Sequence, residues 1–338
     1  FSYKYIETPF RRKVWGDYKW MTIMKGLFII NLSALTLIGL DKSFKTIVFL
    51  GDKKAINNYS EDRFWDRKLC QNDALANKKM IFNNNFFNNC WFNSNKSSEG
   101  IELKGKKLFF FGDSYNEQLM PIASKIFENR SDIKINSFYN RNCSILSSSI
   151  VIEKEKDLNC GRALKDYINF FNNYSDKGDI LIIATPNRFA PPFKAPDSKF
   201  IYSGNQIEDQ LAESLYLEEL KNLSNALKDK GKKLAITSPI PIIKNNPAIC
   251  INWFSRFNNK CKRINTFDLK ANEISKQNLK KYQVLEQYGV IYLDIYSILD
   301  QVLVTNKSNI YNFFYNENHI SKTGALELVN YFKNKLIN

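Results

Sequence analysis

The stretch KKLFFFGDSYNEQ, Lys106–Gln118, predicts a strand, a tight turn and the start of a helix. Residues 108–111 form a continuous apolar run, which is typical of a short strand buried on both faces of a parallel sheet. Gly112 ends the strand, and apolar residues then recur at helical spacing as far as Phe127. Ser114 therefore lies between the carboxyl end of a strand and the amino end of a helix, where open α/β sheets bind ligands.

This position allows two interpretations of Ser114. Backbone N–H groups at a helix start can stabilise an oxyanion, so the serine is a candidate nucleophile. Its hydroxyl can equally serve only as a helix cap. A nucleophilic serine needs a base, and the chain contains one histidine, His319, just before a last amphipathic helix. A lone histidine often has a purely structural role, and the residues by themselves leave both interpretations open.

Strand-like and helical patterns alternate after residue 100. Strands are expected at residues 108–111, 133–138, 180–184, 234–238 and 290–295. Helical patterns lie between them at residues 117–127, 163–171, 207–230 and 269–288. Repeated βα units predict an α/β fold, in which helices cover both faces of a parallel sheet.

GDSY at residues 112–115 and the distant segment NENHISKTG at residues 316–324 resemble motifs of the SGNH (GDSL-type) hydrolase family. In that family the serine is the nucleophile, and the histidine of a C-terminal DxxH motif is the base. The resemblance therefore implies these roles for Ser114 and His319. It also implies a three-layer fold with a five-stranded parallel sheet, which agrees with the alternating pattern.

The chain departs from the family motif three residues before His319, where Asn316 replaces the aspartate. An amide can orient an imidazole, but it cannot stabilise the imidazolium by charge. Asn316 is therefore the candidate orienting residue, and Glu317 and Asp294 are candidates to supply the missing carboxylate.

The resemblance also implies two further oxyanion donors, a glycine after the second strand and an asparagine after the third. Asn142 follows the second strand, where no glycine occurs, and Asn187 follows the third. Arg188-Phe189 resembles an Arg-Trp pair of the acyltransferase-fused branch of the family. Asn187, Arg188 and Asn142 are candidates for binding the oxyanion or the substrate, and ordinary loop roles explain them equally well.

Residues 20–40 form an apolar run with one charge, Lys25, and are long enough to span a bilayer. Aromatic and basic residues precede the run, so the positive-inside rule places its start in the cytoplasm and the chain after Leu40 outside. A cleaved signal peptide and a buried core helix are the alternatives. The chain begins at Phe1 without an initiator methionine, and we expect it to be part of a longer protein.

The string FSYKYIETPFRRK at residues 1–13 resembles the closing motif of the membrane domain of acyltransferase family three. Many bacterial members continue with one extra helix and an exported SGNH domain. The resemblance predicts three parts: residues 1–45 end a membrane domain and include a transmembrane helix at about 20–40, 46–100 are an extracytoplasmic linking segment, and 101–338 form the SGNH domain. The linking segment is expected to pack against the domain, because its aromatic residues need burial.

Six cysteines are present, none in a C-x-x-C pair, and one histidine cannot complete a typical zinc site, so no metal is predicted. An even number in an exported domain predicts disulfides, for which fifteen connectivities are possible. The simplest pairing is sequential: Cys70–Cys90, Cys143–Cys160 and Cys250–Cys261. Buried free cysteines in a cytosolic protein are the alternative.

The net charge of +15 permits a nucleic-acid partner, but the lysines are scattered and no nucleic-acid-binding motif occurs. The two resemblances together imply an O-acyltransferase, most simply an acetyltransferase, of the bacterial inner membrane. Residues after about 41 would lie in the periplasm or outside the cell. A serine acyl-enzyme would pass the acyl group to a cell-envelope polysaccharide such as O-antigen, or to a lipid-linked glycan, without a cofactor.

The resemblance also implies that the missing membrane domain delivers the acyl group, which comes ultimately from acetyl-CoA. A carbohydrate esterase of the same fold and a catalytically inactive glycan-binding module are the alternative functions.

Overall fold

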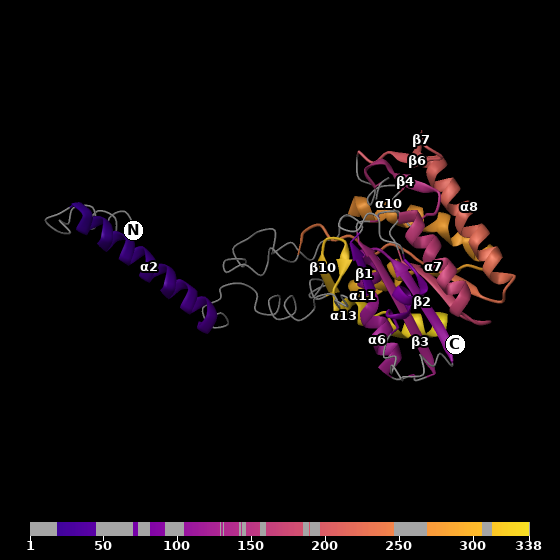
Figure 1. Ribbon diagram of the computed structural model, residues 1–338, viewed down its shortest axis with the longest axis horizontal. Helices are drawn as coiled ribbons and strands as arrows, with labels where there is room; N and C mark the ends of the chain where they lie inside the picture. The colour runs from indigo at the N-terminus through magenta and orange to yellow at the C-terminus, as the bar shows by residue number, and fades with distance from the viewer. Residues whose placement is uncertain are drawn as a thin grey trace.

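The computed structural model describes residues 19–44, 70–73, 82–91, 105–128, 130, 132–141, 143, 147–155, 160–184, 189, 197–246, 269–305 and 313–337. Its centre is a parallel sheet of six strands in the order β1-β3-β2-β5-β8-β9 (Figure 1). These strands are β1 Gln71–Asp73, β2 Lys106–Gly112, β3 Ile133–Arg141, β5 Ile180–Ala184, β8 Lys233–Thr237 and β9 Ile291–Leu293. The five predicted strands are confirmed, and β1 adds a sixth at the edge beside β3.

Helices cover both faces of the sheet (Figure 1). One face carries α4 Asn84–Asn88, α7 Cys160–Tyr174, α8 Asp209–Lys228 and α10 Leu269–Gln283, followed by the 3-10 helix η6 Val284–Tyr288. The other face carries α5 Ser114–Glu117, α6 Met120–Glu128, α11 Ile295–Thr305, α13 Lys322–Leu326 and α14 Val329–Leu336. This arrangement confirms the predicted three-layer α/β fold.

Two small antiparallel sheets accompany the central one. The first consists of β4 Ile150–Ile152, β6 Phe200–Tyr202 and β7 Asn205–Ile207, with the 3-10 helix η3 Glu153–Glu155 after β4. The second is a hairpin of β10 Phe314–Asn316 and β11 His319–Ile320. This histidine hairpin precedes the last two helices and carries the residues that were predicted to act with Ser114.

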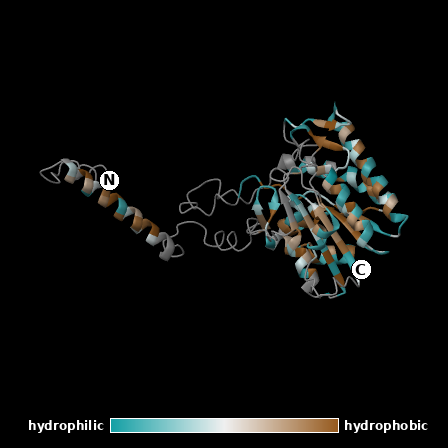
Figure 2. Ribbon diagram, in the orientation of Figure 1, coloured by the Kyte–Doolittle hydropathy of each residue, from teal (hydrophilic) through white to brown (hydrophobic). Residues whose placement is uncertain are grey.

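The apolar run of β2 explains the fold around it, because successive side chains enter opposite layers. Phe109 and Phe111 pack in the layer of α4, α7 and α8, whereas Leu108 and Phe110 pack in the layer of α6, α11 and α14. All four side chains are fully buried. Figure 2 shows the hydrophobic strands at the centre of the domain and hydrophilic residues on the outer sides of the helices.

The described part of the linking segment packs into the domain, as predicted. Phe87 of α4 contacts the ring of Tyr167 in α7, with 5.1 Å between the ring centroids. Trp91 contacts Phe109 of β2 with a centroid distance of 5.2 Å. Both Phe87 and Trp91 are buried, so this segment contributes to the core of the domain.

The apolar run near the start of the chain forms the helix α2, Lys19–Phe44. Large apolar side chains of α2, such as Phe28, Leu35 and Leu37, are exposed in the structure. Among the residues that the structure describes, no helix combines the length and the apolar character needed to cross a membrane. The string at residues 1–13 lies outside the described residues.

The cysteines follow the predicted pairing only in part. Cys143 and Cys160 form a disulfide, which ties the chain after β3 to the first residue of α7. The predicted bridge between Cys70 and Cys90 is not formed, and both residues are buried thiols. Their sulfur atoms are directed at backbone carbonyl oxygens instead, Cys70 Sγ at Asn89 at 3.4 Å and Cys90 Sγ at Phe86 at 3.8 Å. Cys250 and Cys261 lie outside the described residues.

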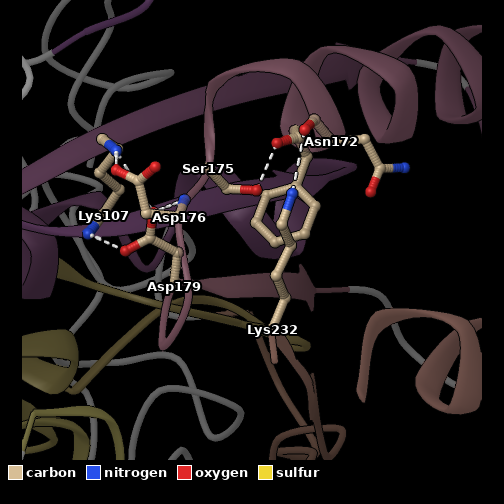
Figure 3. Close-up of polar contacts among 7 residues, drawn as sticks. Lys107, Asn172, Ser175, Asp176, Asp179 and Lys232 are labelled. Carbon is tan, nitrogen blue, oxygen red and sulfur yellow. Dashed lines mark hydrogen bonds and ion pairs between the residues drawn. The ribbon is translucent and has the colours of Figure 1, made fainter. Parts of the chain in front are cut away.

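A buried ion-pair cluster fixes the amino ends of β2 and β5 (Figure 3). The ammonium of Lys107, which is 3% exposed, contacts the carboxylates of Asp176 and Asp179. Asp179 also accepts the backbone N–H of Lys107 at 2.8 Å and that of Asp176 at 2.6 Å. The hydrogen bond from Lys107 lowers the pKa of Asp176. Nearby, Lys232 Nζ donates to the backbone oxygen of Asn172 at 2.9 Å.

Replacing Asp179 by alanine should lower the free energy of unfolding by about 1–3 kcal/mol, because the buried backbone N–H of Lys107 loses its acceptor while the ammonium keeps its contact with Asp176. Urea denaturation followed by circular dichroism measures this change. Asp132→Asn is the control, because Asp132 pairs with Arg130 at the exposed surface, where ion pairs stabilise little. Equal urea concentrations at the midpoint of unfolding for the two variants would mean that the cluster does not stabilise the sheet.

Candidate active site

Ser114 is the first residue of α5, directly after the turn that ends β2. The cap of this helix is Asp113, whose side chain accepts the backbone N–H of Tyr115 at 2.8 Å. Ser114 is therefore not needed as the cap, and its partly exposed hydroxyl points to another partner. The interpretation of Ser114 as only a helix cap therefore does not describe the structure.

Gly112 is required because the turn that carries Ser114, residues 112–118 and here called the serine turn, approaches β5 closely. A Cβ atom at this position would lie 2.3 Å from the carbonyl oxygen of Ala184 and 2.5 Å from the Cβ of Asn116. Asn116, which is fully buried, donates from Nδ2 to the carbonyl oxygen of Phe138 at 2.9 Å and to Ser137 Oγ at 3.2 Å. These contacts fix α5 against β3 and β5, so the position of Ser114 is set by the central sheet.

The histidine hairpin brings His319 and Asn316 to this turn. His319 Nε2 lies 2.7 Å from Ser114 Oγ, although the two residues are 205 positions apart in the sequence. His319 Nδ1 lies 3.0 Å from Asn316 Oδ1. The structure thus assembles Ser114, His319 and Asn316 in one hydrogen-bonded row at the carboxyl edge of the sheet.

The backbone defines which tautomer of His319 fits this row. The N–H of Asn318 donates to Asn316 Oδ1 at 3.0 Å, which identifies that atom as the carbonyl oxygen of the amide. A carbonyl oxygen only accepts, so Nδ1 of His319 carries the proton. In the neutral imidazole Nε2 is then unprotonated, and it faces the hydroxyl of Ser114. This is the arrangement that a general base for a serine needs.

Of the two candidate substitute carboxylates, that of Asp294 has a structural role. Asp294 Oδ1 accepts the backbone N–H of Ser297 at 3.0 Å, where α11 begins. Glu317 is tied through its backbone, whose oxygen accepts the N–H of Ile243 at 3.0 Å. The side chain that contacts Nδ1 of His319 is the amide of Asn316.

The remaining candidates, Asn142, Asn187 and Arg188, lie outside the described residues. Phe189, which follows them, is buried, and its ring packs on Tyr216 of α8 with a centroid distance of 5.1 Å. Burial raises the pKa of Tyr216, and the charges of Glu219 and Asp113 contribute to this shift. Phe189 is therefore anchored on α8. In the described part of the chain no group of three or more potential ligand side chains could hold a metal ion.

The sequence interpretation missed two polar residues of the serine turn, Asn116 and Gln118. Both are buried, and both hydrogen-bond to backbone atoms of neighbouring elements. A signal was available for Gln118, because it lies four positions before Ile122 on the apolar face of the helical pattern. A polar side chain on such a face must find a buried partner.

The parallel sheet and the serine–histidine pair at its carboxyl edge define an α/β protein with the architecture of SGNH hydrolases. The chain belongs to the family described as "SGNH domain (fused to AT3 domains)", which matches residues 70–334. AT3 denotes acyltransferase family three, so this result confirms the two resemblances noted in the sequence. The family and the site geometry together support an enzyme of acyl transfer or ester hydrolysis.

Several solved structures are similar to the chain. The periplasmic domain of a lipopolysaccharide acetyltransferase from Salmonella ser. Paratyphi A is 15% identical, with coverage of 85% of this chain and 98% of that one and a TM-score of 0.49. Axe2, an acetylxylan esterase from Geobacillus stearothermophilus, is 14% identical, with coverage of 70% and 95% and a TM-score of 0.41. A putative SGNH hydrolase from Slackia heliotrinireducens is 10% identical, with coverage of 69% and 99% and a TM-score of 0.40. No curated protein matches the sequence.

Proposed function

We propose that this chain is the part of an O-acyltransferase that transfers an acyl group, most simply acetyl, through a serine acyl-enzyme. The observation that carries the proposal is the contact of 2.7 Å between Ser114 Oγ and His319 Nε2. Nucleophilic acyl transfer starts from such a pair, in which a serine hydroxyl donates to an unprotonated imidazole nitrogen.

In the proposed first half-reaction, Ser114 Oγ attacks the acyl carbonyl carbon while His319 Nε2 takes the hydroxyl proton. The backbone N–H of Ser114, at the start of α5, donates to the oxyanion that forms. The protonated His319 then gives its proton to the leaving group, and the acyl-enzyme remains. In the second half-reaction a sugar hydroxyl attacks this ester, His319 accepts the hydroxyl proton, and Ser114 recovers it when the product leaves.

Asn316 holds the imidazole in the required tautomer through its carbonyl oxygen, but it adds no negative charge. The imidazolium that forms when Ser114 loses its proton is therefore stabilised less than it would be beside an aspartate. We infer that the site works, and that the replacement of the family's aspartate by Asn316 limits its turnover.

The acceptor that we propose is a polysaccharide or lipid-linked glycan of the cell envelope, and the proposed compartment is the periplasm. Fusion to acyltransferase domains in the family supports an acyl donor that is delivered through a membrane domain, ultimately from acetyl-CoA. The disulfide between Cys143 and Cys160 supports an oxidising compartment. A carbohydrate esterase is the second candidate, because water can replace the sugar hydroxyl with the same residues.

The test combines two assays of the full chain with p-nitrophenyl acetate as donor. Nitrophenol release measures acylation, and mass spectrometry of an added O-antigen polysaccharide measures transfer. Acetylated polysaccharide supports the transferase, whereas acetate release without transfer supports the esterase. His319→Gln is the control and should lose both reactions. If the unaltered chain neither cleaves the ester nor reacts at Ser114 with a fluorophosphonate, the catalytic proposal fails and glycan binding becomes the better account.

A further inference from the structure

Gln118 joins the turn of the nucleophile to the backbone of the histidine hairpin. It follows α5 directly as its C-cap residue and is 1% exposed. Its Oε1 accepts the backbone N–H of Ile320 at 2.8 Å, across a sequence separation of 202 residues. Because Ile320 follows His319 in the chain, this bond fixes the backbone beside the base.

Ser114 and Gln118 are four positions apart, so they lie on the same face of this helical turn. That face presents the hydroxyl to His319 Nε2 at one end and the amide oxygen to Ile320 N at the other. The ring of Tyr115, the next residue after Ser114, lies against the imidazole, with 5.5 Å between the ring centroids. The same turn therefore carries the nucleophile and an anchor for the base.

The histidine hairpin depends on such anchors because it is small. Its strands have three and two residues, and it is separate from the central sheet. An isolated two-stranded hairpin is marginally stable in water, so its place is decided by what it packs against. The backbone of Ile243 holds its turn through the oxygen of Glu317, and Gln118 holds its second strand from the side of Ser114.

We propose that Gln118 is a positioning residue that keeps His319 at hydrogen-bond distance from Ser114. This inference rests on the proposed function for its effect on rate, but the position of the imidazole can be measured without activity. Gln118 is buried under the site and does not need to touch the substrate. Its loss should therefore act on the chemical step rather than on substrate binding.

Gln118→Leu keeps the approximate side-chain volume, removes the acceptor and leaves the buried N–H of Ile320 unpaired. A misplacement of about 1 Å at a reacting group costs on the order of a hundredfold in rate. We expect kcat on p-nitrophenyl acetate to fall about a hundredfold with KM nearly unchanged. Gln118→Glu keeps an acceptor oxygen at the same reach and should recover most of the rate. Gln118→Asn keeps the amide but shortens its reach, so it provides a milder variant if Gln118→Leu does not fold.

The matched control is Asn136→Leu, which removes another buried amide that pairs with backbone. Asn136 donates to the oxygen of Phe87 at 2.8 Å and accepts from Tyr167 at 2.8 Å, in the opposite layer of the domain. This variant should lose stability as Gln118→Leu does, but it should keep the kcat of the unaltered chain. A merely structural role of Gln118 would make the two variants behave alike.

The single histidine of the chain allows a readout that does not require catalysis. With [15N]histidine incorporated, NMR at pH 8 should show one tautomer, protonated at Nδ1, in the unaltered chain and in Asn136→Leu. In Gln118→Leu we expect a mixture of tautomers or exchange broadening. An unchanged imidazole spectrum in Gln118→Leu would overturn the positioning role, even if the protein proved to have no acyltransferase activity. Absence of activity in the unaltered chain, with an altered spectrum only in Gln118→Leu, would instead overturn the proposed function alone.

Discussion

Replacing Ser114 by alanine should lower kcat on an acetyl ester by at least about a hundredfold, because removing the serine of a complete Ser-His-Asp site costs about a million-fold and exchanging its aspartate for asparagine already costs about ten-thousand-fold. The hydroxyl that contacts His319 at 2.7 Å is the group that would form the acyl-enzyme, and alanine offers no replacement. The fold should survive, because Asp113 rather than Ser114 caps α5. Ester hydrolysis and fluorophosphonate labelling, with thermal unfolding as a check on the fold, measure these outcomes.

Ser124→Ala is the matched control for this experiment. Ser124 is a half-buried serine of α6, the next helix along the chain, so the same hydroxyl is removed without touching Ser114. This variant should keep both its activity and its fluorophosphonate label. Residual labelling of Ser114→Ala at the level of the unaltered chain would show that another serine reacts, and the assignment of the nucleophile would then be wrong.

Replacing Asn316 by aspartate should raise kcat at least tenfold. Exchanging aspartate for asparagine beside the histidine of a serine protease lowered turnover by about ten-thousand-fold, and the substitution here reverses that exchange. In the structure Asn316 Oδ1 already accepts from Asn318 N–H and contacts His319 Nδ1, so an aspartate oxygen can keep both contacts. The negative charge would then stabilise the imidazolium, which the amide cannot do. Steady-state kinetics on p-nitrophenyl acetate measure the gain.

Asp294→Asn and Glu317→Gln test whether a carboxylate already serves His319. Asp294 caps the start of α11, and Asn316 is the side chain at 3.0 Å from His319 Nδ1, so both variants should keep the kcat of the unaltered chain. If Asn316→Asp gains nothing while one of these two variants loses activity, that carboxylate supplies the charge. The role of Asn316 would then be orientation alone.

Local patterns were sufficient for much of the fold. The apolar run from Leu108 to Phe111 predicted β2. The alternating βα pattern predicted four further strands of the sheet, β3, β5, β8 and β9. A side chain's tendency to be buried, and the period at which apolar residues recur, are properties of neighbouring residues. The pairing of Cys143 with Cys160 was also found correctly, because the two cysteines flank one loop.

Features that depend on distant segments were not available from those patterns. No sequence pattern near Gln71–Asp73 indicated that β1 would extend the sheet beside β3. No pattern near Cys70 and Cys90 indicated that their sulfur atoms would face carbonyl oxygens. A short strand is stabilised by the edge it meets, and a disulfide requires a specific distance and orientation of two backbones. Both are decided when the layers pack.

The sequence by itself determined the turn that presents Ser114, the single histidine that can serve it, and the amide at Asn316 in place of a carboxylate. Only the tertiary structure decided that the serine and the imidazole meet at 2.7 Å, that Asn318 N–H selects the carbonyl oxygen of Asn316, and that Gln118 anchors the hairpin. The physical reason is that residue type sets what a side chain can donate or accept, whereas the packing of sheet, helices and hairpin sets which atoms come within reach of one another.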